Sequence, residues 1–341
     1  MTTRDALISR FLDKAGWADA TRAPLAGDAS NRRYLRLSRA DTGETSVLMD
    51  APPDRGEDIG PFMRIAGHLQ SHGFSAPRLL SWDDAAGLLL LEDLGDDLFA
   101  RVVQRAPGAE DSLYSCATDL LARLHEVPPP SGLPPYDTSL MSDLAKLAWD
   151  WYLPAATGID ATDNTAFKGA MRAALDHDAP DADVLVQRDY HAENLLWLPD
   201  RTGTARVGLL DFQDAMRGHR AYDLVSLLQD ARRDVPAETE DRMLARYITA
   251  TGVDDDAFRA AYACLGAQRN LRIIGVFTRL CLRDGKAHYI DMLPRVWGLL
   301  ERDLAAPGLS TLATRVHAAM PAPTPAILQR LKDQCQTIPA Q

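Results

Sequence analysis

Residues 184–214 read VLVQRDYHAENLLWLPDRTGTARVGLLDFQD and carry the most informative pattern of the chain. An apolar strand leads into Asp189, Asn194 follows five residues later, and a second apolar strand ends at Asp211. Phosphoryl transfer requires such a set. One carboxylate accepts the proton of the attacking hydroxyl, while an amide oxygen and a second carboxylate hold a divalent cation. The combination predicts phosphoryl transfer, whereas an isolated Asp–Asn pair would indicate no more than a capped turn.

The residues before this stretch have the pattern of a small, strand-rich domain. Apolar residues at helical spacing predict helices over residues 3–15 and 57–72. Strand-like segments separated by turn residues lie at 22–25, 33–38, 46–50, 77–82 and 87–92. The strand-rich part ends near Leu94, which predicts one domain over residues 1–94 and a second over residues 95–341.

The second domain is predicted to be mostly helical. Helical periodicity covers residues 110–126, 139–153 and 163–177, and helices dominate again from about residue 221 to 304. Three short strand-like segments interrupt them, at residues 184–187, 195–198 and 207–210. The proline-bearing tail beyond residue 304 is weakly specified. The pattern as a whole favours the α+β class.

Composition and charge exclude several classes of protein. The 341 residues include 37 lysines and arginines and 48 aspartates and glutamates, which gives a net charge of −11. This balance argues against a nucleic-acid binder, and no apolar run approaches the ~20 residues of a membrane span. The charged N-terminus lacks the apolar core of a signal peptide. The four cysteines form no CxxC pair, so we expect reduced thiols and a cytoplasmic location. The sequence does not indicate an obligate protein partner.

These motifs resemble the aminoglycoside phosphotransferase and choline kinase group, whose members have the protein-kinase-like fold. The pattern of the group is an apolar strand, H-x-D-x-x-x-x-N, a second apolar strand and D-F, and Gln187 stands here in place of the histidine. The resemblance implies two lobes: a small antiparallel-sheet N-lobe that covers a nucleotide, and a larger helical C-lobe with the catalytic loop. It further implies ATP as the donor, Asp189 as catalytic base, and Asn194 with Asp211 as Mg²⁺ ligands.

One feature of the group is missing. A lysine on the third strand normally contacts the nucleotide phosphates, but residues 46–50 read SVLMD and no lysine occurs between residues 15 and 145. Either another cation replaces it, or the chain does not transfer phosphate. Because side chains alternate along a strand, Arg32 and Arg36 share one face and Arg33 lies on the other. Each of these arginines is a candidate for the missing charge.

The turn before these arginines and the exit of the last predicted strand complete the expected nucleotide site. Small turn residues let backbone N–H groups approach phosphate oxygens. This favours nucleotide binding by Gly27, Asp28, Ala29, Ser30 and Asn31, with a plain surface hairpin as the alternative. The segment after residues 88–91 resembles the hinge of the group, which implies that the backbone of Glu92 and Leu94 bonds adenine.

Longer segments resemble a narrower group, the bacterial anomeric kinases of N-acetylmuramate and N-acetylglucosamine. They lie between residues 27 and 232 and include the lysine-free strand. The resemblance implies ATP-dependent phosphorylation of the sugar C1 hydroxyl in peptidoglycan recycling. N-acetylmuramate carries a lactyl carboxylate that an arginine would bind, and the candidates are Arg217, Arg232, Arg269 and Arg272. His191 and Asp214 complete the candidate sugar site, although loop packing is favoured for His191. Asp223 matches a position that holds the catalytic loop.

Two alternatives remain open at this point. The first is the same fold acting on another hydroxyl, such as that of an aminoglycoside, choline or homoserine. A cationic aminoglycoside requires an acidic site, whereas N-acetylmuramate requires a cationic one. The second is a nucleotide-binding pseudokinase, which the missing lysine and Gln187 would suit.

Overall fold

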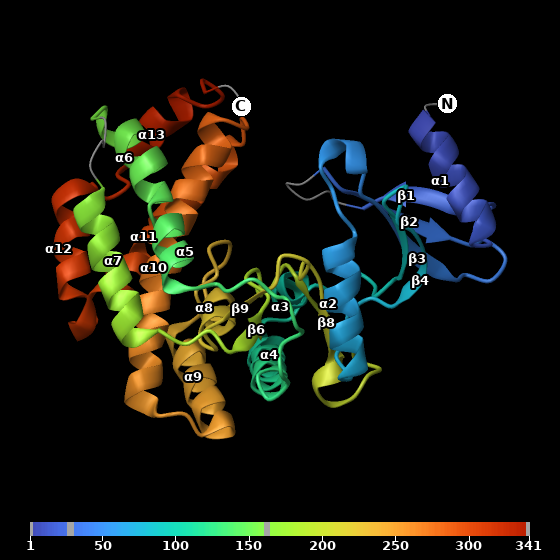
Figure 1. Cartoon of the computed structure of the whole chain (residues 1–341), viewed down its shortest axis with the longest axis horizontal. Coiled ribbons are helices and arrows are strands. Elements are labelled where there is room, and N and C mark those ends of the chain that lie inside the picture. The colour runs from blue at the N-terminus through green and yellow to red at the C-terminus, as the bar shows by residue number, and fades with distance from the viewer. Residues whose placement is uncertain (1–2, 26–30, 160–163, 339–341) are drawn as a thin grey trace. The chain divides into compact units, whose positions relative to one another are not determined.

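The computed structural model describes residues 3–25, 31–159 and 164–338. The chain divides into two compact units, and Figure 1 labels most of their helices and strands. Unit 1 comprises Met1–Leu120 and Ala192–Ala215, and unit 2 comprises Leu121–His191 and Met216–Gln341. The chain thus returns to unit 1 once, for the segment that contains Asn194 and Asp211. The boundary at residue 94 stays a prediction.

Unit 1 is built on a five-stranded antiparallel sheet. Its strands are β1 (Thr21–Pro24), β2 (Arg33–Ser38), β3 (Thr45–Asp50), β4 (Leu79–Asp83) and β5 (Leu88–Glu92). Their order in the sheet is β1-β2-β3-β5-β4. The five strands expected from the sequence are therefore confirmed. The register places Arg33 opposite Asp50 and Arg36 opposite Val47, so neighbouring arginines of β2 face opposite sides of the sheet.

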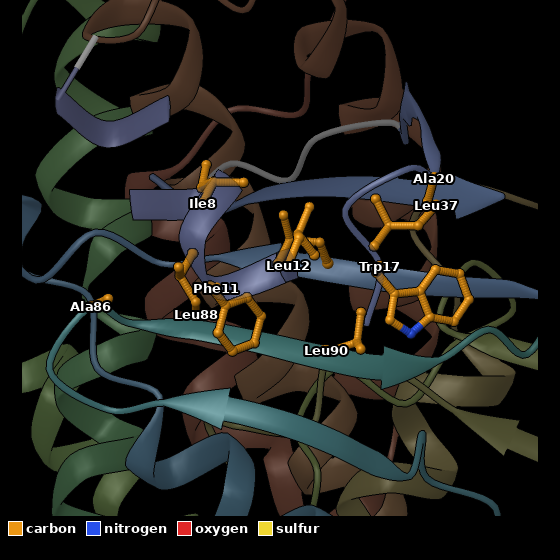
Figure 2. Close-up of a cluster of buried hydrophobic side chains, with 10 residues drawn as sticks. Ile8, Phe11, Leu12, Trp17, Ala20, Leu37, Ala86, Leu88 and Leu90 are labelled. Atoms are coloured by element: carbon orange, nitrogen blue, oxygen red, sulfur yellow. The ribbon is translucent and has the colours of Figure 1, made fainter. Parts of the chain in front are cut away.

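Helix α1 (Thr3–Lys14) covers one face of this sheet (Figure 2). The buried cluster between them is formed by Ile8, Phe11, Leu12, Trp17, Leu37, Leu48, Leu88 and Leu90. The helix stops where Gly16 adopts a left-handed φ of 75° and the Trp17 N–H donates to the Leu12 carbonyl at 2.7 Å. Each fully buried apolar side chain stabilises the fold by roughly 1.5–3 kcal/mol, so this apolar face fixes the position of α1.

The remaining elements of unit 1 support the segment that contains Asn194 and Asp211. They are α2 (Gly60–Ser71), α3 (Phe99–Arg105), β7 (Leu195–Trp197) and β8 (Val207–Leu209). The predicted helix over 57–72 is thus confirmed as α2. Strands β7 and β8 pair antiparallel, with Leu195 opposite Leu209. A further helix, α4 (Glu110–Leu124), continues from unit 1 into unit 2.

Unit 2 is helical and centres on α10 (Asp255–Leu282), whose N-terminus is capped by the Asp254 carboxylate, 2.9 Å from the Ala257 nitrogen. The other helices are α5 (Thr138–Ala145), α6 (Leu153–Thr157), α7 (Thr165–Asp178), α8 (Tyr222–Leu228), α9 (Ala237–Thr251), α11 (Leu293–Leu304), α12 (Ser310–Ala319) and α13 (Pro325–Asp333). Gly275 lets α10 approach the Leu147 backbone, because a Cβ there would lie 2.2 Å from the Leu147 carbonyl carbon.

Three features of unit 2 differ from the expectations. The helix expected over 139–153 is interrupted by a wider π turn at Ala148–Tyr152, because Pro154 has no N–H to continue the α-helical bonds. The tail folds into α12 and α13. Strand β9 (Met216–Gly218), which was not expected, pairs with β6 (Val184–Val186). Over the described residues, no helix is long and apolar enough to cross a membrane.

Candidate active site

In unit 2, the loop that contains Asp189 follows β6 and is held by α8. The Asp223 carboxylate of α8 is fully buried and accepts the backbone N–H of Gln187 at 2.6 Å and of Arg188 at 2.9 Å. The role expected for Asp223 is thus confirmed. Burial raises the pKa of Asp223 to about 7, although the two backbone donors act to lower it.

Arg188 adopts a left-handed conformation, with a φ of 74°. This conformation is uncommon for a residue with a side chain, and the surroundings must hold it. Besides Asp223, the Ser226 hydroxyl donates to the Arg188 carbonyl at 3.3 Å. The Arg188 guanidinium lies over the Tyr136 ring, 5.4 Å from its centre. These contacts fix the backbone directly before Asp189.

Asp189 lies among positive charges of unit 2. Burial acts to raise its pKa, but Arg272, Arg269 and Arg188 hold the pKa of this carboxyl below its ordinary value. Asp189 is therefore a carboxylate at neutral pH. A carboxylate is able to accept a hydrogen bond from a substrate hydroxyl and then its proton.

His191, expected either to contact substrate or to pack the loop, is buried in unit 2. Burial lowers its pKa to about 4, so the imidazole is neutral at pH 7. Its Nε2 lies 3.3 Å from Nη1 of Arg232. Because arginine can only donate, Nε2 accepts and the imidazole proton is on Nδ1. His191 thus orients Arg232 and contributes no charge of its own.

The candidate sugar residues have different surroundings. Arg232 contacts His191, and Arg269 of α10 is buried and donates from Nη2 to the Ser226 hydroxyl at 2.8 Å. Both therefore belong to the surroundings of the Asp189 loop. Arg217 lies in β9 with its side chain exposed, and Asp214 is an exposed residue of unit 1.

In unit 1, β7 and β8 bring Asn194 and Asp211 together. The Leu210 N–H donates to the Asn194 carbonyl at 3.0 Å, and Nδ2 of Asn194 lies 3.4 Å from Oδ2 of Asp211. Asp211 has a left-handed φ of 56°, and Oδ1 accepts from the Gln213 amide at 2.6 Å. Next to Asp211, the buried Phe212 contacts Phe62 of α2, with ring centres 4.9 Å apart. The strand end is thus rigidly held.

The Asn194–Asp211 pair fits a divalent cation. Carboxylate and amide oxygens are hard ligands, and Mg²⁺ typically takes one or two carboxylates and fills its shell with water and substrate phosphates. Among the described residues, no group of three or more His, Cys, Asp or Glu could form a metal site built from protein ligands alone. One carboxylate with one amide suits a cation that arrives with a phosphate ligand.

Arg36, a candidate for the missing cation, binds the loop that follows β5. Its Nη1 donates to Asp96 at 2.6 Å, and its Nη2 donates to Oδ1 of Asp93 at 2.9 Å and to the Gly95 carbonyl at 3.2 Å. Oδ1 of Asp93 also accepts the Gly95 N–H at 3.0 Å. Arg36 therefore fixes the segment expected to act as hinge, which contains Leu94.

Arg33 lies on the face of the sheet that α1 covers. Its guanidinium is paired with Asp50, and Arg4 of α1 binds the same carboxylate through Nε at 2.8 Å. Asp50 is fully buried at the end of the lysine-free strand β3. The pairing of one carboxylate with two arginines ties α1 to the sheet.

Arg32 directly precedes β2 and lies an even number of positions before Arg36, so side-chain alternation places the two on the same face. Its Nε donates at 2.7 Å to Glu57, and the Asn31 N–H donates to the same carboxylate at 3.1 Å. Burial acts to lower the pKa of Arg32, but Glu57 and Asp214 raise it above its ordinary value. Arg32 thus interacts with the segment that follows Asp211. Gly27, Asp28, Ala29 and Ser30, expected to bind nucleotide, lie outside the described residues.

Sequence reasoning missed two of these supporting residues. Glu57 precedes α2, and its arginine partner lies 25 residues earlier in the chain. Ser226 lies in α8 and connects Arg188 with Arg269. The acidic residue at the start of the helix after β3 was an available signal for Glu57, because kinases pair the third-strand lysine with a glutamate of the following helix.

The fold and these residues define a phosphotransferase of the protein-kinase-like class. The chain belongs to the phosphotransferase enzyme family, whose model matches residues 21–262. Membership of this family implies ATP as the phosphate donor and a divalent cation as its partner.

Relatives and solved structures agree with this assignment. A relative from Caulobacter vibrioides, named N-acetylmuramate/N-acetylglucosamine kinase, is 40% identical over 94% of this chain and 98% of its own length. A protein of the same name from Pseudomonas aeruginosa is 34% identical over 88% of this chain and 90% of its own length.

The fold is shared with more distant structures. The macrolide 2′-phosphotransferase MphH from Brachybacterium faecium has a TM-score of 0.55 at 16% identity and covers 89% of this chain and 98% of its own. Plasmodium vivax ethanolamine kinase has a TM-score of 0.53 at 12% identity and covers 91% of this chain and 84% of its own. At such low identity, these likenesses concern the fold alone.

Proposed function

We propose that the chain phosphorylates the anomeric C1 hydroxyl of N-acetylmuramate and of N-acetylglucosamine, with ATP as donor. The observation that carries this proposal is the 40% identity to a kinase of these two sugars over nearly the whole of both chains. The cationic surroundings of Asp189 support it, because N-acetylmuramate is an anion and the cationic aminoglycosides would be repelled there.

In this reaction Asp189 is the catalytic base. The carboxylate orients the C1 hydroxyl and accepts its proton as the oxygen attacks the γ-phosphate. A hemiacetal hydroxyl is more acidic than an ordinary alcohol, so a carboxylate with a lowered pKa is a sufficient base. The hydrogen bonds of Asp223 to Gln187 and Arg188 keep the loop in one conformation.

We propose that Asn194 and Asp211 hold Mg²⁺ on the nucleotide. When bound, the cation offsets the negative charge of the phosphates. The left-handed Asp211 and its bond from Gln213 preorganise the carboxylate.

Arg32 is our choice for the cation that replaces the third-strand lysine. Arg33 is paired on the α1 face and Arg36 is engaged by the loop after β5, whereas Arg32 is held by Glu57 and interacts with Asp214. An arginine–glutamate pair then takes the part that a lysine–glutamate pair has in other kinases. The backbone of Glu92 and Leu94 would bind adenine, and residues 27–31 would cover the phosphates.

The product would be a sugar 1-phosphate that returns amino sugars of the cell wall to biosynthesis, which is a recycling role. Such a role places the enzyme in the cytoplasm, where ATP is available. All four cysteines are free thiols, which suits a reducing compartment.

The proposal is tested with an ADP-release assay on both sugars, with ³¹P NMR to identify the phosphorylated position. We expect an anomeric phosphate with each sugar, and loss of turnover in Asp189→Asn with ATP binding retained. Turnover with choline, homoserine or an aminoglycoside, but with neither amino sugar, would overturn the substrate assignment.

A further inference from the structure

Gln213 lies two residues after Asp211 in unit 1 and binds one oxygen of its carboxylate. The amide nitrogen of Gln213, Nε2, donates to Oδ1 of Asp211 at 2.6 Å. A hydrogen bond to an ionised carboxylate is stronger than one between two neutral groups. Oδ1 is therefore engaged by the protein itself, and an oxygen that already accepts such a bond is a weaker ligand for a cation.

This bond fixes the orientation of the Gln213 amide. A carboxylate only accepts hydrogen bonds, so the NH₂ end of the amide faces Asp211 and its oxygen points away. The side chain is buried, with 7% of its surface exposed, and Oε1 has no hydrogen-bond partner among the described residues. A buried acceptor without a partner costs free energy. The arrangement thus holds Asp211 in place at the expense of stability, which is typical of functional sites.

The second oxygen of the Asp211 carboxylate faces the other proposed ligand. Oδ2 of Asp211 lies 3.4 Å from Nδ2 of Asn194, so Gln213 is on the side of Oδ1 and Asn194 is on the side of Oδ2. The left-handed φ of 56° at Asp211 and the packing of Phe212 against Phe62 hold this orientation. A cation that Asn194 and Asp211 share is therefore bound through Oδ2.

Magnesium and calcium differ in how they use a carboxylate. Mg²⁺ requires a near-octahedral shell at about 2.0–2.1 Å, which suits one oxygen from each carboxylate. Ca²⁺ is larger, takes about six to eight oxygens and readily accepts both oxygens of one carboxylate. A side chain that engages one of the two carboxylate oxygens therefore favours Mg²⁺.

We propose that Gln213 is a positioning residue that makes the cation site selective for Mg²⁺ over Ca²⁺. Gln213 engages Oδ1 of Asp211 and so directs the cation to Oδ2. The inference rests on the proposed role of Asn194 and Asp211 as cation ligands. Gln213 acts through Asp211 and touches neither the cation nor the sugar.

The test compares Gln213→Leu with wild type in the binding of an ATP analogue with a β,γ-imido bridge. Calorimetry measures the dissociation constant in excess Mg²⁺ and in excess Ca²⁺. Loss of a group that orients a metal ligand typically weakens metal binding by about 10- to 100-fold, so we expect the constant in Mg²⁺ to rise about tenfold. The constant in Ca²⁺ should stay within about threefold, because the released carboxylate is able to offer Ca²⁺ both oxygens.

Gln70→Leu is the matched control. Gln70 also lies in unit 1, and its Nε2 donates to the Pro77 carbonyl at 2.7 Å. This substitution removes an amide donor far from Asp211 in the sequence and should leave both dissociation constants unchanged. Equal weakening of the two complexes in a folded Gln213→Leu variant, or no change in either complex, would overturn the assignment to Gln213.

The wild-type protein tests the inference if Gln213→Leu does not fold. It should bind the Mg²⁺ complex of the analogue about tenfold or more tightly than the Ca²⁺ complex, and equal binding would overturn the selectivity. Binding of the analogue that is the same with and without a divalent cation would overturn the proposed role of Asn194 and Asp211 as well.

Discussion

Oδ1 of Asp223 lies 2.9 Å from the backbone nitrogen of Arg188, a residue held at a φ of 74°. This bond connects the buried helix α8 to the residue directly before Asp189. Because a left-handed arginine is uncommon, its conformation depends on such contacts.

Asp223→Asn should therefore impair both catalysis and stability. An amide group can accept from only one of the two backbone N–H groups, so one buried donor loses its partner. We expect a loss of roughly 1–3 kcal/mol in the free energy of unfolding and a fall in kcat of about tenfold or more. Urea unfolding and steady-state kinetics measure the two effects. The exposed Asp241→Asn on α9 is the control, and an unchanged kcat in Asp223→Asn would contradict the role.

Arg32 and Arg33 are neighbours in the chain that pair with different carboxylates, Glu57 and Asp50, and they form a matched pair of variants. We expect Arg32→Gln to raise the KM for ATP about tenfold or more, because the cation proposed to bind the phosphates is lost. Arg33→Gln should lower the melting temperature, since Asp50 loses a partner, and leave the KM for ATP unchanged. The KM for ATP of each variant comes from the same ADP-release assay. The reverse pattern would assign the phosphates to Arg33.

Arg36→Gln tests the loop that follows β5. Without its bonds to Asp93, Asp96 and Gly95, the segment expected to bind adenine should lose its fixed conformation. We expect the KM for ATP to rise by roughly threefold to tenfold, with the KM for the sugar unchanged. Arg105→Gln, which breaks an exposed pair with Asp97, is the control. Equal effects of the two substitutions would argue against a positioning role for Arg36.

Stability should fall as the pH rises through the neutral range. Burial raises the pKa of Asp303 to about 8 and that of Asp223 to about 7. In the native state these two carboxyls hold protons that the unfolded chain has released, so they make the free energy of unfolding decrease with pH up to these values. Below about pH 6.5, His125, His191 and His219, whose pKa values burial lowers, act in the opposite direction, so the fall is expected above that pH.

Asp303→Asn should flatten this dependence. Melting temperatures from pH 5 to 9 measure this dependence. The variant should fold, because the Asn270 amide is able to flip and satisfy the new amide at position 303. Asp234→Asn is the control, because the pKa of Asp234 is lowered by its pairing with Arg295 and its titration lies below this window. A slope that Asp303→Asn leaves unchanged would mean that Asp303 is ionised in the native state.

The strands and helices with strong local patterns were predictable. Helix α2 was expected from Phe62, Ile65 and Leu69, and all three are buried. Strand β9 was missed because Met216–Gly218 has no alternation and becomes a strand only by pairing with β6. Helix α13 was missed because prolines were read as breakers, although Thr324 caps the helix and Pro325 occupies its first turn.

The residues of the candidate site were predictable where they belong to a local sequence motif. They were not predictable where their role depends on an ion pair with a residue far away in the chain. The motif spacing together with the flanking apolar strands identified Asp189, Asn194 and Asp211, and their roles stay predictions. The sequence did not choose among Arg32, Arg33 and Arg36, because the choice depends on which carboxylate each arginine meets. Those carboxylates, such as Glu57, come from elements that only the folded chain brings close.

Lys14 is the single lysine of unit 1, and from residue 15 to 145 every side chain with a permanent positive charge is an arginine. A guanidinium stays protonated at any pH that the fold survives, and its nitrogens are poor nucleophiles. A nucleotide analogue with an amine-reactive acyl phosphate, of the kind that acylates a lysine at the phosphate site of other kinases, finds no amine between residues 15 and 145. The enzyme would thus escape lysine-directed labelling and inhibition, and selective covalent inhibitors would have to target a different side chain.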